Sequence, residues 1–330
     1  MKIESKSQVT YFSVGVNILL TLGKLAVGIA TGSAAIISEA AHSASDLVTS
    51  LISLFSVREA EKPPDQDHPY GHGKYENFGS FAVALMIIAS GIYVCSRALR
   101  ELIFGVQIQS IGLGAGVMLG AAVANYFISA FLIKMGKKFD SPAIEADGWH
   151  SRSDVFTAGG VFVSLVIIHF TGWYALDPAV AILISWVILY VGVHIGYEAF
   201  SVLVDSRIPV EAEEKIRRII EARWEDYIEY HSFRARKAGS QVDMDLHLVF
   251  PDSTSLAEAH KVTEELERQI SGIIPGTRVL IHIEPCDNGQ NIRDNCRHQD
   301  PDQECSLADI PRKCGFNRDN VTTGEIERKV

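Results

Sequence analysis

Two histidine–aspartate pairs stand out because they lie within long apolar runs. His42 and Asp46 occur in A-H-S-A-S-D, and His150 and Asp154 occur in W-H-S-R-S-D. Residues four apart in an α-helix lie on one face, so each pair would present an imidazole nitrogen and a carboxylate oxygen in the same direction. Brought together, the two pairs offer two nitrogen and two oxygen ligands, a tetrahedral set suited to Zn²⁺.

The H-x-x-x-D spacing is weak by itself, since His298 and Asp302 also fit it and His194 and Glu198 form a similar pair. The first two pairs gain weight from their likeness. Each has an acid three residues before the histidine, a serine after it and a serine before the aspartate. The alternative is a set of interhelical hydrogen bonds worth about 1 kcal/mol each. Serine or asparagine would make such bonds without burying charge, which favours the metal interpretation.

The elements that must position these pairs are membrane spans. Six apolar runs are long enough to cross a bilayer, at 10–31, 33–57, 78–99, 111–135, 143–170 and 177–204. Both pairs fall near the middle of their runs, the second and the fifth. Ionisable residues at that depth face a bundle interior or a cavity.

Lysine and arginine indicate the orientation of the spans. They precede the first run, follow the last and occupy the second–third and fourth–fifth connections, whereas the other three connections, at 31–33, 105–110 and 171–175, have none. Both termini are therefore expected in the cytoplasm, in a multi-pass protein of a bacterial inner membrane. The first run is too long for a cleaved signal peptide. The net charge of −10 argues against nucleic acid as a partner.

Composition divides the chain into three parts: a six-helix transmembrane domain (1–206), a charged cytoplasmic domain (207–285) and a polar tail (286–330). Periodicity in the second part predicts an α-β-β-α-β order, with a small open sheet covered by helices on one face. The expected helices are 210–224 and 255–270, and the expected strands are 229–237, 241–250 and 277–284. The tail carries Cys286, Cys296, Cys305 and Cys314 without a C-x-x-C spacing, which is compatible with solvated disorder or a flexible metal-gathering segment.

The six spans, the paired motif in spans two and five and the small cytoplasmic domain resemble the cation diffusion facilitator family of metal/proton antiporters, over about residues 10 to 285. The resemblance implies a homodimer with a metallochaperone-like cytoplasmic domain. It implies alternating access and export of Zn²⁺, or of Fe²⁺, Cd²⁺, Co²⁺ or Mn²⁺, in exchange for protons. It implies no enzymatic activity. The family often has aspartate where this chain has His42. A membrane metal sensor that does not transport is the alternative function.

The resemblance also implies three further features. In the loop before span three, Asp65, His68 and His72 would bind a second metal, although a solvated turn is an alternative. Lys74 would pair with Asp205 at the dimer interface. A cytoplasmic metal cluster that regulates transport or stabilises the dimer would comprise His231, His247, His260, His282 and Glu284, with glutamate where the family commonly has aspartate.

Overall fold

The computed structural model describes residues 4–31, 34–104, 113–171, 176–274 and 276–286. Its internal contacts separate two compact units. The first comprises Met1–Ser206 with Ala238–Ser240, and the second comprises Arg207–Lys237 and Gln241–Val330. The predictions for the tail, including those on Cys296, Cys305 and Cys314, fall outside the described residues.

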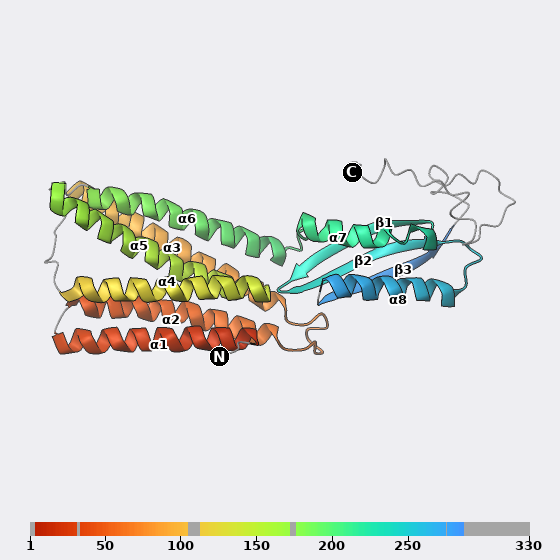
Figure 1. The fold of residues 1–330 in the computed structure, drawn as a ribbon, viewed down its shortest axis with the longest axis horizontal. Helices are drawn as coiled ribbons and strands as arrows, with labels where there is room; N and C mark the ends of the chain where they lie inside the picture. Colours follow the sequence, from red (N-terminus) through yellow and green to blue (C-terminus); the bar gives the residue numbers. More distant parts are fainter. Residues whose placement is uncertain (1–3, 32–33, 105–112, 172–175, 275, 287–330) are drawn as a thin grey trace. The chain divides into compact units, whose positions relative to one another are not determined.

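Six long helices form the first unit (Figure 1). They are α1 (Lys6–Thr31), α2 (Ala34–Ala60), α3 (Lys74–Phe104), α4 (Leu113–Phe139), α5 (Pro142–Thr171) and α6 (Leu176–Leu203). Each coincides with one predicted span and most extend a few residues beyond it. Among the described residues, α1, α3 and α6 are long and apolar enough to cross a membrane by themselves. The six-helix prediction is confirmed.

Close backbone packing fixes α5 against α4. A Cβ atom on Gly148 of α5 would lie 2.8 Å from the backbone nitrogen of Ile133. A Cβ atom on Gly136 of α4 would lie 2.7 Å from the backbone nitrogen of Glu145. Only glycine fits at such distances, so these two positions let the helices approach beside His150.

The face of α1 that turns inward is polar. Lys6, Thr10, Ser13, Asn17, Thr21 and Lys24 recur at intervals of three or four residues, and all are buried or half-buried. The opposite face is apolar and exposed, as at Tyr11, Leu19 and Leu22. This arrangement is the reverse of a soluble amphipathic helix, and it suits a helix with lipid on one side and polar neighbours on the other.

The second unit has a helix-covered sheet. Its elements are α7 (Val210–Glu221), a 3-10 turn (Trp224–Asp226), β1 (Glu229–Ala238), β2 (Gln241–Phe250), α8 (Leu256–Ile273) and β3 (Thr277–Pro285). The strand order is β1-β2-β3, and β2 pairs with β3 in parallel. Alternate β2 residues from Val242 to Leu248 are buried with the apolar sides of α7 and α8. The predicted α-β-β-α-β order is confirmed.

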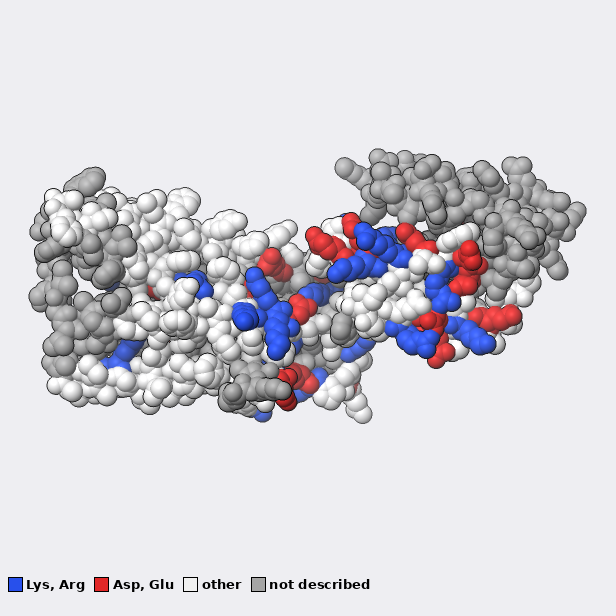
Figure 2. All heavy atoms as spheres, viewed as in Figure 1, with Lys and Arg blue, Asp and Glu red and all other residues white. Residues whose placement is uncertain are grey.

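The boundaries of the two cytoplasmic helices have local causes. Ser255 and Glu258 form a capping box at the start of α8, as expected for a serine before a helical pattern. The predicted 210–224 helix ends earlier, at Glu221. The chain turns there, and the buried Tyr227 donates a hydrogen bond of 2.8 Å to the carbonyl of Ile220. Charged side chains gather over this unit, whereas the six long helices are largely uncharged (Figure 2).

Candidate metal centres

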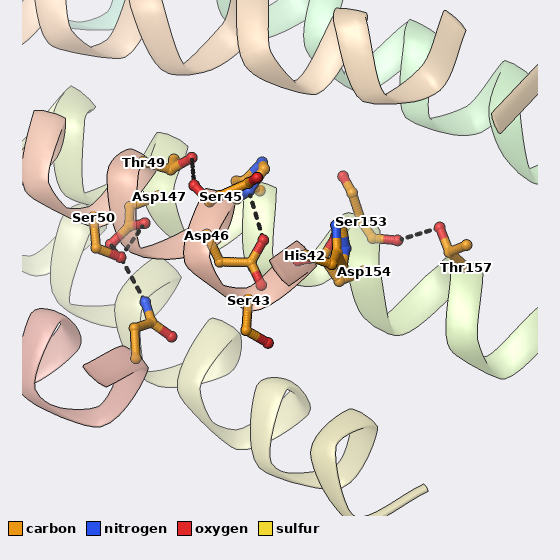
Figure 3. A network of polar contacts seen from close by, with 12 residues as sticks. His42, Ser43, Ser45, Asp46, Thr49, Ser50, Asp147, Ser153, Asp154 and Thr157 are labelled. Carbon is orange, nitrogen blue, oxygen red and sulfur yellow. Dashed lines mark hydrogen bonds and ion pairs between the residues drawn. The ribbon is translucent and has the colours of Figure 1, made fainter. Parts of the chain in front are cut away.

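The two histidine–aspartate pairs meet across α2 and α5. His42 Nε2 lies 3.5 Å from Asp154 Oδ1, and His150 Nε2 lies 3.4 Å from Asp46 Oδ1. Each imidazole therefore faces the carboxylate of the other helix. Ligand atoms of His42, Asp46 and Asp154 all lie within 4.8 Å of one another (Figure 3). His150 adjoins this group through its contact with Asp46.

Several polar atoms of this group are buried without a hydrogen bond. Within the described part of the chain they are Asp46 Oδ1, Asp154 Oδ2 and both ring nitrogens of His150, the 3.4 Å contact between His150 and Asp46 being an ion pair and not a hydrogen bond. Native proteins leave few buried polar atoms unsatisfied, because each costs about 1–3 kcal/mol. His42 is the more open member, with a side chain that is 49% exposed. The arrangement is that of a ligand set prepared for a cation, with access on the His42 side.

A third carboxylate lies beside this group. Asp147 of α5 is buried and accepts hydrogen bonds from Ser13 of α1 and Ser50 of α2. The sequence shows an acid three residues before His150 but assigns it no role. Asp147 could have been identified as a candidate from the sequence, because an ionisable residue inside a span is energetically costly and is usually kept for a function. Lys24, another intramembrane residue to which the sequence assigns no role, donates to Ser43 at 2.6 Å.

The loop between α2 and α3 brings its three predicted ligands together. Asp65 contacts His68 Nδ1 through Oδ1 and His72 Nε2 through Oδ2, both at 3.3 Å. His72 is buried, and its Nδ1 has no hydrogen-bond partner among the residues that the structure describes. The backbone N–H of His68 donates to Asp65, which lowers the pKa of that carboxyl, and the two imidazoles lower it further. Asp65 is thus kept ionised, as a metal ligand must be.

The cytoplasmic sheet gathers one ligand from each strand. Glu284 of β3 contacts His247 Nδ1 of β2 at 2.7 Å and His231 Nε2 of β1 at 3.3 Å. His282 pairs with His247 in the parallel register, and its Nε2 lies 3.7 Å from Glu284. His260 is exposed on α8 and is not part of this three-residue group.

One further predicted pair, and one pair that shares only the spacing of the ligand pairs, are in contact within the chain. Lys74, at the start of α3, contacts Asp205 at 2.8 Å and also donates to the carbonyl of Leu203. The chain reverses at Asp205, which has a positive φ of 59°. His194 and Glu198 lie 3.4 Å apart on an exposed face of α6, away from the ligand groups.

Comparison with known families identifies the class of protein. Residues 10–204 match the cation efflux transmembrane domain, and residues 208–286 match the cation efflux protein cytoplasmic domain. The chain belongs to the cation efflux, or cation diffusion facilitator, family of transporters.

Individual relatives cover most of the chain. The Cation-efflux pump FieF of Citrobacter koseri is 32% identical over 268 residues, which are 81% of this chain and 89% of that protein. An uncharacterized transporter of Synechocystis, sll1263, is 29% identical over 91% of this chain and 94% of its own length. A solved structure of CzrB is 35% identical but covers only 24% of this chain and 96% of its own, with a TM-score of 0.23.

Proposed function

We propose that this chain exports Zn²⁺ or a similar divalent cation from the cytoplasm in exchange for protons. The transport site would consist of His42, Asp46, His150 and Asp154. The observation that carries the proposal is the pair of crossed contacts, His42 with Asp154 and Asp46 with His150, at 3.5 and 3.4 Å. A sensor could bind metal in water at lower cost, so buried ligands within spans favour transport. The relatives named FieF are called cation-efflux pumps, which agrees with this direction.

The donor set favours zinc among the candidate cations. Two imidazole nitrogens and two carboxylate oxygens suit a tetrahedral ion, whereas Mg²⁺ and Ca²⁺ prefer more oxygen ligands. Fe²⁺, Co²⁺, Cd²⁺ and Mn²⁺ remain alternative cargoes because affinity alone separates such ions poorly.

Exchange for protons follows from the same ligands. A metal ion requires neutral imidazole and ionised carboxylate, so protons and metal compete for His42, Asp46, His150 and Asp154. A site that opens alternately to each side of the membrane would release protons when it loads metal and take up protons when it discharges the metal. No enzymatic step is needed.

The other two ligand groups would bind metal without transporting it. The loop group of Asp65, His68 and His72 and the sheet group of His231, His247 and Glu284 both lie outside the long helices. His282 adjoins the sheet group and could widen it, with His260 as a more distant candidate. We assign these groups to regulation or to stabilising a homodimer. The family model of the cytoplasmic domain is named ZT_dimer, in keeping with this assembly.

Membrane placement completes the proposal. The distribution of lysine and arginine supports cytoplasmic termini, and we assign the chain to a bacterial inner membrane as a multi-pass protein. The Lys74–Asp205 contact would then lie near the cytoplasmic membrane surface, at the dimer interface.

Everted membrane vesicles test the function directly. Wild-type vesicles should accumulate zinc when a proton gradient is applied, and Asp46→Ala or Asp154→Ala should abolish the uptake. Glu198→Gln is the matched control, since Glu198 is an acid of α6 that contacts a histidine outside the ligand groups. Normal uptake by either alanine variant would refute the assignment of the site.

A further inference from the structure

Asp147 is a buried carboxylate held by hydroxyl groups of two other helices. Its side chain accepts hydrogen bonds from Ser13 at 2.8 Å and from Ser50 at 3.0 and 3.3 Å. Asn17 donates to Ser50 at 2.6 Å, which extends the network along α1. The residue is 1% exposed, and no ion pair joins it to a lysine or arginine in the described part of the chain. Asp147 is therefore a hydrogen-bonded junction of α1, α2 and α5.

This junction belongs to a ladder of contacts between the two ligand-bearing helices. From one end of the ladder, the α2–α5 partners are His42 with Asp154, Asp46 with His150, Ser50 with Asp147, and Ser53 with the carbonyl of Ala143. Numbers rise along α2 while they fall along α5, so the helices are antiparallel. Adjacent rungs are about one helical turn, or roughly 5 Å, apart.

The rungs of the ladder differ in kind. The two ligand rungs, at 3.5 and 3.4 Å, leave buried atoms that have no hydrogen bond to any described residue. The Ser50–Asp147 and Ser53–Ala143 rungs are hydrogen bonds of 3.0 and 3.1 Å. These two hydrogen-bonded contacts therefore set the separation of α2 and α5 when no metal is bound to the ligand set. Figure 3 shows Ser50 and Asp147 meeting one turn of α2 away from Asp46.

On its other side, α5 packs closely against α4 at Gly148, so α5 has little space in which to move away from α2. A change at Asp147 would accordingly be transmitted mainly to the α2–α5 separation. Interhelical adhesion alone does not require a carboxylate, since serine or asparagine supplies it at lower cost. A carboxyl group has two oxygens and can accept hydrogen bonds from α1 and α2 at once, whereas a single hydroxyl is less suited to this.

We propose that Asp147 is a positioning residue that sets the spacing of the α2 and α5 ligands and thereby the size selectivity of the site for divalent cations. The inference rests on the proposed function, because it assumes that His42, Asp46, His150 and Asp154 bind the transported ion. Loss of the junction would let the ligands separate, which favours the larger Cd²⁺ over Zn²⁺, since selectivity among such ions depends on geometry.

The test measures zinc and cadmium affinities by competition on the purified full-length protein. The loop and sheet groups are removed in all samples by Asp65→Ala and His247→Ala. We expect Asp147→Ala to lower the zinc-to-cadmium affinity ratio about tenfold, within the range known for residues that orient metal ligands. Asp147→Asn should restore most of the ratio, because its amide oxygen still accepts from Ser13 and Ser50. Ser50→Ala should lower the ratio in the same direction, and its effect should not add to that of Asp147→Ala.

The control is Ser129→Ala, which removes a buried hydroxyl whose one hydrogen bond among the described residues lies within α4, to the carbonyl of Tyr126. It should leave the ratio unchanged. An unchanged ratio in Asp147→Ala, or an equal loss for both ions, would overturn the inference; if Asp147→Ala does not fold, the same two outcomes in Ser50→Ala would overturn it. Asp154→Ala separates this inference from the proposed function: if that variant still binds zinc at wild-type affinity, the function itself is wrong.

Discussion

Replacing Asp154 by asparagine keeps the size of the side chain and removes one negative charge from the ligand set. Asp154 contacts His42 across the helix interface, and its second oxygen is buried without a hydrogen bond. In the metal-free protein the carboxylate is therefore poorly compensated. Its neutralisation should leave thermal stability unchanged or slightly higher, because burying a poorly compensated charge costs free energy of folding.

Zinc affinity, unlike stability without metal, should fall in Asp154→Asn. A direct ligand contributes at least as much to metal affinity as the residues that orient it. The variant should therefore bind zinc about 100-fold more weakly. At a free zinc concentration about 100 times the wild-type Kd, bound zinc stabilises the native state by about 2.7 kcal/mol. The same concentration would only equal the Kd of Asp154→Asn, and the stabilisation would fall to about 0.4 kcal/mol.

Thermal unfolding with and without zinc measures both effects. The samples carry Asp65→Ala and His247→Ala so that only the membrane group binds, and Glu198→Gln serves as the control. The zinc-induced shift should be nearly lost in Asp154→Asn and retained in the control. A full shift in Asp154→Asn would refute the assignment, and a large loss of stability without zinc would show that Asp154 is mainly structural.

Three further outcomes follow from the geometry. His42→Asp should move ion preference from Zn²⁺ toward Cd²⁺ or other divalent ions, because it exchanges nitrogen for oxygen; an unchanged ranking in competitive transport would contradict this. Loop-site binding of zinc should weaken on acidification, because a metal ion requires neutral imidazole ligands and protons compete with it, whereas Asp65, whose pKa is lowered, stays ionised; a zinc affinity in calorimetry that does not fall between pH 7 and pH 5 would contradict histidine ligands there. Glu213→Gln should lower the free energy of unfolding of the cytoplasmic unit by about 1–2 kcal/mol at neutral pH, since burial alone would raise the pKa of Glu213 but hydrogen bonds from Arg207 and Arg217 outweigh it and lower that pKa. That difference is present above the ordinary pKa of glutamate and disappears as pH falls through the lowered value; denaturant unfolding that shows a constant difference would contradict it.

The six spans and the α-β-β-α-β order could be predicted because hydropathy and periodicity act locally along the chain. The shared face of His42 and Asp46, and of His150 and Asp154, follows equally from helical spacing. The early end of α7 at Glu221 was not predictable, since it depends on where Tyr227 is buried.

Contacts between distant segments were harder to predict. Nothing near Asp147 in the sequence shows that Ser13 and Ser50 will donate to it, because the three residues meet only after α1, α2 and α5 have packed. His260 illustrates the reverse case. The family resemblance groups it with the sheet histidines, but α8 presents it on an exposed surface outside the three-residue group.

Zinc flux in proteoliposomes tests the central claim most directly. Purified protein is reconstituted, a pH gradient is imposed and internal zinc is followed with a fluorescent indicator. Wild-type protein should move zinc against the proton flow, with the flux lost in Asp46→Asn and Asp154→Asn and kept in Glu198→Gln. Zinc flux that ignores the pH gradient would contradict proton exchange, and flux that survives both aspartate changes would contradict the site.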